Sequence, residues 1–191
     1  FLITWKTATY TPAAFTGKLL PGANSPITVA FEIIENGKLT DLSRQTIYWY
    51  LENNFIQGGQ GVQSVSFIAD KNVAGGSQTL RIQLPNFRDD LLIKYVDIPV
   101  VQPEAVIEAP FPREKISEAQ IKLFGRPYFF NVKSPADLSF SWTAGDQPPA
   151  SSNEPENLVI NLGENVQNDT PLSVNLSIQN PNNIFEEAVK T

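Results

Sequence analysis

The amino-acid sequence predicts an all-β protein built from two consecutive sandwich domains. Three observations lead to this prediction: apolar residues recur at every second position in short runs, 15 Pro and 11 Gly separate the runs, and the pattern restarts in the second half of the 191 residues. Period-two alternation is typical of strands with one buried face, whereas frequent Pro and Gly favour turns over long helices. The chain is also long enough for two domains of ordinary size.

In the first half, alternation predicts strands separated by turn residues. The expected strands are residues 27–33, 47–51, 62–67, 80–84 and 91–101. The spacing within 62–67 indicates a bulge or a late strand start. The Gly-rich stretch Gly58-Gly59-Gln60-Gly61 lacks the Lys-Ser/Thr of a phosphate-binding loop, so we expect it to be a hairpin turn. Short strands at about ten-residue spacing are typical of a sandwich or a barrel.

The second half repeats this layout. Its expected strands are residues 128–132, 138–142, 158–162, 172–178 and 184–189. Trp49 precedes Leu91 by 42 residues, and Trp142 precedes Ile184 by the same number. Each half therefore has about the length of an immunoglobulin-like sandwich, with one Trp on a mid-domain strand. We predict two tandem immunoglobulin-like β-sandwich domains, residues 1–101 and 102–191, related by internal duplication.

The boundary between the halves is rich in proline. Pro99, Pro103, Pro110 and Pro112 predict a short, stiff, extended linker, with the boundary near residues 100–104 and no central strand there. Residues 113–120 are the one place where the sequence allows a helical turn, and their charges suit a solvated loop equally well.

One segment carries a family resemblance. Phe140-Ser141-Trp142-Thr143-Ala144-Gly145-Asp146 resembles the C strand and following turn of bacterial immunoglobulin-like (PKD-like) cell-surface repeats. The resemblance implies that Trp142 packs between two sheets, and Trp49 is its counterpart in the first half. Both tryptophans are in phase with apolar neighbours, so we expect them to be core anchors. The resemblance also implies an extracytoplasmic protein, on the cell surface or secreted, whose modules serve as spacers, adhesins or filament parts.

Composition excludes several classes of function. The chain has no Cys and no His, so disulfides, thiolate nucleophiles, Cys- or His-ligated metals and His-dependent catalytic triads are excluded. A net charge of -6 with scattered basic residues disfavours nucleic acid and anionic membranes. We therefore expect a non-enzymatic protein without a cofactor.

Acidic residues occur in pairs, but their arrangement does not predict a glycosidase. Adjacent acids on a strand point to opposite faces, whereas hydrolysis of a glycoside needs two carboxylates facing each other across a cleft. We expect these acids to be solvated surface charge: Asp89-Asp90, Glu186-Glu187, and Glu154 with Glu156.

Two weaker patterns concern one Asn-rich region. Glu164, Asn168 and Asp169 supply oxygen ligands of the kind that Ca²⁺ prefers, although a plain turn is the favoured interpretation. Asn168 and Asn175 each begin an N-glycosylation sequence, and Asn175 is expected to face outward. Whether either is glycosylated stays open.

Candidate interaction residues lie on one strand and at the N-terminus. Tyr48 and Tyr50 have the opposite phase to Trp49, so they are expected to stack on a sugar or a partner, or to cover a sheet face against the neighbouring domain. Near the N-terminus, an apolar and β-prone end is suited to completing the sheet edge of another copy; its candidate residues are Phe1, Leu2, Ile3 and Trp5.

These observations support three functional hypotheses. The leading one is a structural or adhesive module of a larger cell-surface protein, with any membrane anchor outside these residues. The second is a self-assembling filament or pilus-like subunit that exchanges terminal strands with other copies of itself. The third is a carbohydrate-binding module. The sequence leaves open whether the partner is a protein or a glycan.

Overall fold

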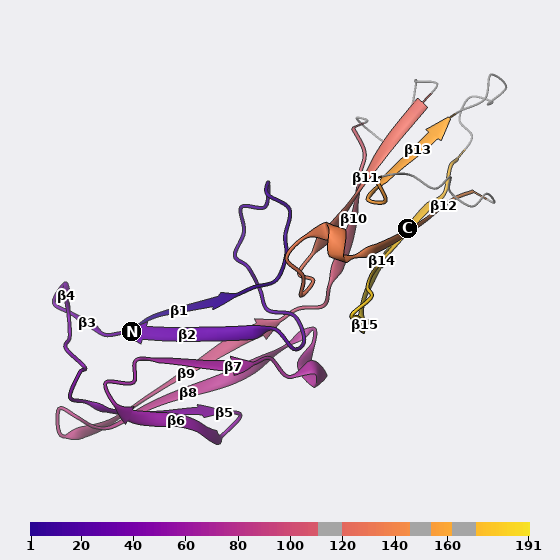
Figure 1. The fold of residues 1–191 in the computed structure, drawn as a ribbon. Helices are drawn as coiled ribbons and strands as arrows, with labels where there is room; N and C mark the ends of the chain where they lie inside the picture. Colours follow the sequence, from indigo (N-terminus) through magenta and orange to yellow (C-terminus); the bar gives the residue numbers. More distant parts are fainter. Residues whose placement is uncertain (111–119, 146–153, 162–170) are drawn as a thin grey trace. The chain divides into compact units, whose positions relative to one another are not determined.

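The computed structural model describes residues 1–110, 120–145, 154–161 and 171–191 (Figure 1). Packing divides the chain into two compact units, and each contains a short segment from the N-terminal part of the chain. Unit 1 comprises Phe1–Thr9 and Lys18–Val101, and unit 2 comprises Tyr10–Gly17 and Gln102–Thr191. Apart from two 3-10 turns, the regular elements of the described ranges are strands, so the all-β prediction is confirmed.

Unit 1 is a sandwich of a three-stranded and a four-stranded sheet, with orders β1-β2-β7 and β6-β5-β8-β9 and all neighbours antiparallel. A small hairpin, β3-β4, and the 3-10 turn η1 complete it. The elements are β1 (Leu2–Thr7), β2 (Pro26–Glu32), β3 (Ile34–Glu35), β4 (Lys38–Leu39), β5 (Thr46–Leu51), β6 (Asn54–Gln60), β7 (Ser64–Ile68), η1 (Lys71–Val73), β8 (Gly76–Phe87) and β9 (Asp90–Val100).

The core of unit 1 forms where the alternating strands of both sheets face each other. Strand β2 buries every second side chain, including Phe31, and β5 buries Ile47 and Trp49 from the opposite sheet. The rings of Phe31 and Trp49 meet edge to face at 5.5 Å between centroids. Full burial of a side chain of this size contributes roughly 1.5–3 kcal/mol. Burial of apolar side chains between the two sheets is therefore the main force that holds the sheets together.

The first three residues of the Gly-rich stretch of unit 1 are strand, so the predicted hairpin at Gly58-Gly59 is wrong, and only Gly61 lies in a turn, with a φ of 68°. Gly58 and Gly59 both lie in β6, and Gly58 pairs with Tyr48 of β5. The turn that joins β5 to β6 comes earlier, at Glu52 and Asn53, which have φ angles of 47° and 67°. Two consecutive left-handed residues are typical of a tight hairpin turn. The late strand start predicted within residues 62–67 is correct, since β7 begins at Ser64.

Unit 2 contains two three-stranded sheets in its described part, with orders β10-β11-β13 and β12-β14-β15. Its elements are β10 (Glu104–Glu108), β11 (Gln120–Tyr128), the 3-10 turn η3 (Pro135–Asp137), β12 (Ser139–Ala144), β13 (Asn157–Asn161), β14 (Val174–Asn180) and β15 (Asn183–Lys190). Strand by strand, these orders repeat β1-β2-β7 and β5-β8-β9 of unit 1. Both units are therefore immunoglobulin-like sandwiches in tandem, and β6 has no counterpart among the described residues of unit 2.

Each unit contains the same kind of polar contact inside its own sandwich. In unit 1, the indole Nε1–H of Trp49 donates to the carbonyl oxygen of Val62 at 2.8 Å; in unit 2, Trp142 donates to the carbonyl of Pro155 at 3.1 Å. In each case the acceptor lies 13 residues after the tryptophan. An identical spacing in both sandwiches supports their origin by duplication.

One expectation about unit 2 changes. The strand expected at residues 128–132 is wrong, because β11 ends at Tyr128 and Phe129 has a φ of 62°, which interrupts extended backbone. Phe130 forms only an isolated bridge with Tyr10. The Pro-rich stretch contains strand β10, which lies at the edge of its sheet; this agrees with the expectation that no central strand lies there, because an edge strand tolerates flanking prolines. Of the helical turn expected at 113–120, residues 113–119 lie outside the described residues.

Candidate interaction face

The outer face of the four-stranded sheet gathers the aromatic residues that alternate with the core. On β5, Trp49 is fully buried (0% exposed), whereas Tyr48 and Tyr50 point to the opposite side and are half-buried. Because the side chains of a strand alternate between its two faces, burial of the tryptophan places both tyrosines on the outer face.

Strand register aligns a row of four residues across this face. Tyr50 lies opposite Phe55 of β6 and opposite Arg81 of β8, and Arg81 lies opposite Tyr95 of β9. We call Phe55, Tyr50, Arg81 and Tyr95 the Arg81 row. The ring centroids of Tyr50 and Phe55 are 5.8 Å apart, and the guanidinium Cζ of Arg81 lies over the Tyr50 ring at 4.0 Å from its centroid. Both contacts are favourable cross-strand interactions of aromatic rings.

The two ends of the Arg81 row are exposed. Phe55 is 59% exposed and Tyr95 is 55% exposed. Of this row, only Tyr50 was predicted from the sequence as an interaction residue. For Arg81 a signal was present, since it alternates with the buried Leu80 and Ile82 on a predicted strand. For Phe55 no strand was predicted, and no local pattern indicated which residues lie opposite one another.

A second row runs beside the first and contains Tyr48. Gly58, Tyr48, Gln83 of β8 and Ile93 of β9 lie opposite one another in turn. A Cβ atom at Gly58 would lie only 2.5 Å from Cδ1 of Tyr48, so the glycine makes room for the tyrosine ring. This close approach explains why a glycine occupies a strand position on β6.

Arg81 differs from the cations that form ion pairs in the structure. Among the described residues, ion pairs join Arg88 to Glu35, Lys122 to Glu154 and Arg126 to Glu108, and none involves Arg81. The Nε atom of Arg81 is buried and has no hydrogen-bond partner within the described ranges. The nearest acid on this face by register, Asp97, accepts a hydrogen bond of 2.8 Å from the hydroxyl of Thr79. The face therefore carries a guanidinium group that forms no ion pair with a carboxylate of the described residues.

The N-terminal candidates lie in their own unit. Leu2, Ile3 and Trp5 belong to β1, which pairs with β2 over its whole length. Phe1 stacks on Phe31 at 5.5 Å, and Ile3 and Trp5 pack against the core of unit 1. Lys18 covers the ring of Trp5, and burial lowers the pKa of its ammonium group. Strand β1 therefore occupies the first position of the sheet β1-β2-β7 within its own unit.

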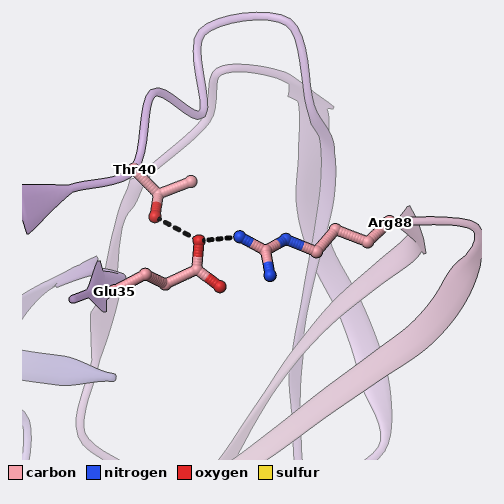
Figure 2. Close-up of polar contacts among 3 residues, drawn as sticks. All are labelled: Glu35, Thr40 and Arg88. Atoms are coloured by element: carbon pink, nitrogen blue, oxygen red, sulfur yellow. Dashed lines mark hydrogen bonds and ion pairs between the residues drawn. The ribbon is translucent and has the colours of Figure 1, made fainter.

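Within the described part of the chain, the predicted acid pairs lie on different elements: Asp89-Asp90 at the turn that leads from β8 into β9, Glu154 with Glu156 before β13, and Glu186-Glu187 on β15. Glu35 accepts hydrogen bonds from Thr40 and Arg88, and so connects the β3-β4 hairpin to the turn between β8 and β9 (Figure 2). Glu186 is 2% exposed, so the prediction that it is surface charge is wrong, whereas its neighbour Glu187 is exposed on the other face of β15. No three Asp or Glu side chains within the described residues gather closely enough to hold a metal ion.

The carboxylate of Glu186 serves a structural purpose. It accepts hydrogen bonds from the backbone N–H and the side-chain amide of Asn131, and one of 2.7 Å from the amide of Asn180. These bonds connect β15 to the segment after β11 and to the end of β14. Buried carboxylates persist where such donors surround them.

The remaining candidates are placed as follows. Glu164, Asn168 and Asp169 lie outside the described residues. Asn175 is half-buried, and its amide donates to the hydroxyl of Thr143 at 3.2 Å.

Within the described ranges, no helix has the length and apolar character needed to cross a membrane.

Comparison with known proteins finds similarity only among solved structures. No protein-family model and no curated protein sequence matches the chain. Three N-terminal domains of Hoc, the highly immunogenic outer capsid protein of bacteriophage RB49, match 98% of this chain with 11% identity and a TM-score of 0.46. The fibronectin(III)-like modules of Clostridium thermocellum CbhA match all of it with 10% identity and a TM-score of 0.30. The D1–D4 ectodomain fragment of ICAM-5 matches 98% with 12% identity and a TM-score of 0.35.

The extent of these matches differs between the neighbours. This chain spans 56% of the Hoc structure, 51% of the ICAM-5 structure and 90% of the CbhA structure. At these identities and TM-scores the neighbours carry no argument about function. The assignment to the immunoglobulin-like class depends on the strand orders and cores of the chain itself.

Proposed function

We propose that this chain is a structural or adhesive module of a larger extracytoplasmic protein, acting through the surfaces of two tandem sandwiches. The observation that carries the proposal is that each unit has its own hydrophobic core, with the same tryptophan-to-carbonyl contact at the same spacing. Repeated self-contained units suit a protein that extends or presents a surface, because each unit needs only its own residues to fold.

The polar and aromatic groups of the described residues support a surface-acting protein. Tyr48, Tyr50 and Arg81 lie on the outer face of a sheet, whereas Glu186, the one deeply buried carboxylate among the described residues, is bound by amides of its own unit. The extracytoplasmic location belongs to the same proposal and follows from the likeness of the Trp142 segment to cell-surface repeats. The PKD-like assignment of that segment is part of the proposal too.

The self-assembling subunit is a second candidate, and one observation favours it. Strand β15 pairs on one side with β14 and has no partner on its other side among the described residues. It also exposes Phe185 (86% exposed), Ile184 and Val189. An apolar strand at the edge of a sheet is a template for pairing with another chain. Against exchange of the N-terminal strand stands the complete pairing of β1 within unit 1.

A carbohydrate-binding module receives less support from the geometry. Stacking a sugar on Tyr50 requires a free ring face, but the guanidinium of Arg81 covers that ring. Phe55 stands at 72° to Tyr50 and at 66° to Tyr48, so these three rings do not make a flat platform.

Stretching single molecules from end to end tests the proposal. Two self-contained modules should give two unfolding events, each releasing about 300 Å of chain for roughly 90 residues. Trp49→Phe should lower the unfolding force of one event and Trp142→Phe that of the other, because each substitution removes the indole donor of one unit. A single event that both substitutions weaken equally would contradict the proposal.

A further inference from the structure

We propose that the Arg81 row docks an acidic peptide segment of a protein partner, in which one Asp or Glu lies between apolar side chains. The inference names the contact surface of the proposed module and therefore rests on the proposed function. Three observations support this inference: the charge of Arg81, the exposure of the two ends of the row and the spacing of the four strands.

The charge of Arg81 identifies the chemistry of the partner. Its guanidinium Cζ lies 4.0 Å from the centroid of the Tyr50 ring, a contact that supplies no hydrogen-bond acceptor to its N–H groups. No carboxylate forms an ion pair with it in the described part of the chain, and its Nε is buried without an acceptor. A partly desolvated cation of this kind binds a carboxylate better than a neutral group, because charge-assisted hydrogen bonds are the stronger ones.

The composition of the face matches that of protein interfaces. Tyr and Arg are the residues in which interface binding energy is concentrated, together with aromatic rings in general. Phe55 and Tyr95 are both more than half exposed at opposite ends of the row, and Ile93 is exposed beside Tyr95. A partner that covers these side chains therefore gains apolar contacts on both sides of the guanidinium.

Other occupants fit the face less well. A nucleic acid or an anionic membrane requires several cations together, whereas this row holds one cation in a chain of net charge -6. A stacked sugar requires a free ring face at Tyr50, which Arg81 occupies.

The spacing of the row predicts the pattern of the peptide. Neighbouring strands are about 4.8 Å apart, which places Tyr95 about 5 Å and Phe55 about 10 Å from Arg81 across the sheet. In an extended peptide, side chains on one face recur every second residue, or about 6.7 Å. A peptide that crosses the strands with its acid at Arg81 places one apolar side chain about 2 Å beyond Tyr95 and the other about 3 Å short of Phe55, so each lies within reach of one end of the row. The expected pattern is apolar-x-Glu-x-apolar.

A peptide array tests the inference with the full 191-residue chain. The probes are synthetic peptides of the pattern apolar-x-Glu-x-apolar, with Leu, Phe, Tyr or Val at the apolar positions, each paired with a copy that carries Gln in place of Glu. We expect the Glu peptides to be enriched among those bound, and their affinity to fall about tenfold or more in Arg81→Gln. The matched control is Arg44→Gln, which removes an exposed cation outside the row and should change the affinity less than about twofold.

Each outcome of the array decides for or against the inference. Equal binding of Glu and Gln peptides, equal losses in Arg81→Gln and Arg44→Gln, or binding of no peptide would overturn it. Binding of an acidic oligosaccharide, tested with oligogalacturonate, in the absence of peptide binding would assign the face to a glycan instead. Unchanged thermal unfolding of Arg81→Gln shows that its fold is intact.

The stretching experiment separates this inference from the proposed function. Two unfolding events without peptide binding would contradict the inference and leave the proposed function standing, whereas a single unfolding event would contradict the proposed function itself.

Discussion

Replacing Glu186 with Ala should destabilise unit 2 far more than the same change at its neighbour Glu187. The buried Glu186 carboxylate is the shared acceptor of three N–H groups from Asn131 and Asn180. Hydrogen bonds to charged groups contribute about 1.5–3 kcal/mol each, and removal of one partner from a buried charged network costs about 3–5 kcal/mol. We expect a loss of about 3–5 kcal/mol for Glu186→Ala.

Glu187 is the matched control for this experiment. It is exposed on the outer face of β15, where it accepts a hydrogen bond of 3.0 Å from the hydroxyl of Ser177, so Glu187→Ala should change the free energy of unfolding by less than about 0.5 kcal/mol.

Urea unfolding of protein labelled with fluorotryptophan measures both units in one sample by fluorine NMR. The Trp142 signal reports unit 2 and the Trp49 signal reports unit 1. For Glu186→Ala, the midpoint of the Trp142 transition should fall by roughly 1–5 M, while the Trp49 transition stays in place. Equal effects of the two Glu substitutions, or an equal shift of both tryptophan transitions, would refute the assignment of Glu186 as a structural carboxylate within a self-contained unit.

Three further predictions follow from single contacts. Gly58→Ala should cost about 1–3 kcal/mol in urea unfolding, because the new methyl group meets Tyr48 at 2.5 Å; an unchanged midpoint would show that the ring moves freely. Trp49→Phe should cost about 2 kcal/mol by calorimetry, through the lost indole hydrogen bond and the vacated volume, and a neutral result would contradict the role of this residue as core anchor. Hydrogen bonds from Lys122 and from Asn157 hold the pKa of Glu154 below its ordinary value, so its contribution to stability is present above pH ~4.3 and is lost as the pH falls through the lowered pKa. Carbon-13 NMR should find that titration midpoint lowered, and Lys122→Gln should raise it; equal midpoints in the two proteins would count against the ion pair.

Much of the fold was predictable where one face of a strand is buried. Strands β2, β5, β8 and β14 alternate apolar and polar residues because each has a core side and an outer side. The equal spacing from each tryptophan to the last strand of its half indicated a repeat, and the two units also contain the same indole-to-carbonyl contact.

The failures arose where another force overrides local pattern. Gly58 is a strand residue because Tyr48 of the neighbouring strand needs the space, and no property of residues 54–60 alone contains that information. The aromatic run after β11 has strand propensity, but the left-handed backbone of Phe129 ends the strand there. Glu186 is buried although it is acidic, because two asparagines distant in sequence or across a turn supply its donors.

The candidate face was only partly predictable for the same reason. Alternation against Trp49 was enough to place Tyr48 and Tyr50 outward. Bringing Phe55, Arg81 and Tyr95 into one row with them depends on the register of strands β6, β8 and β9. Register is set by turns and by packing of the whole sheet, so it becomes visible only in the folded chain.

The most direct test of the central claim is the mass of the chain in solution, measured by light scattering over a wide range of concentrations. A module that acts through its surfaces should remain a monomer of 21.1 kDa throughout. Assemblies that grow with concentration, and that disappear when Phe185 on the open edge of β15 is replaced by Lys, would contradict the account and establish the self-assembling subunit instead.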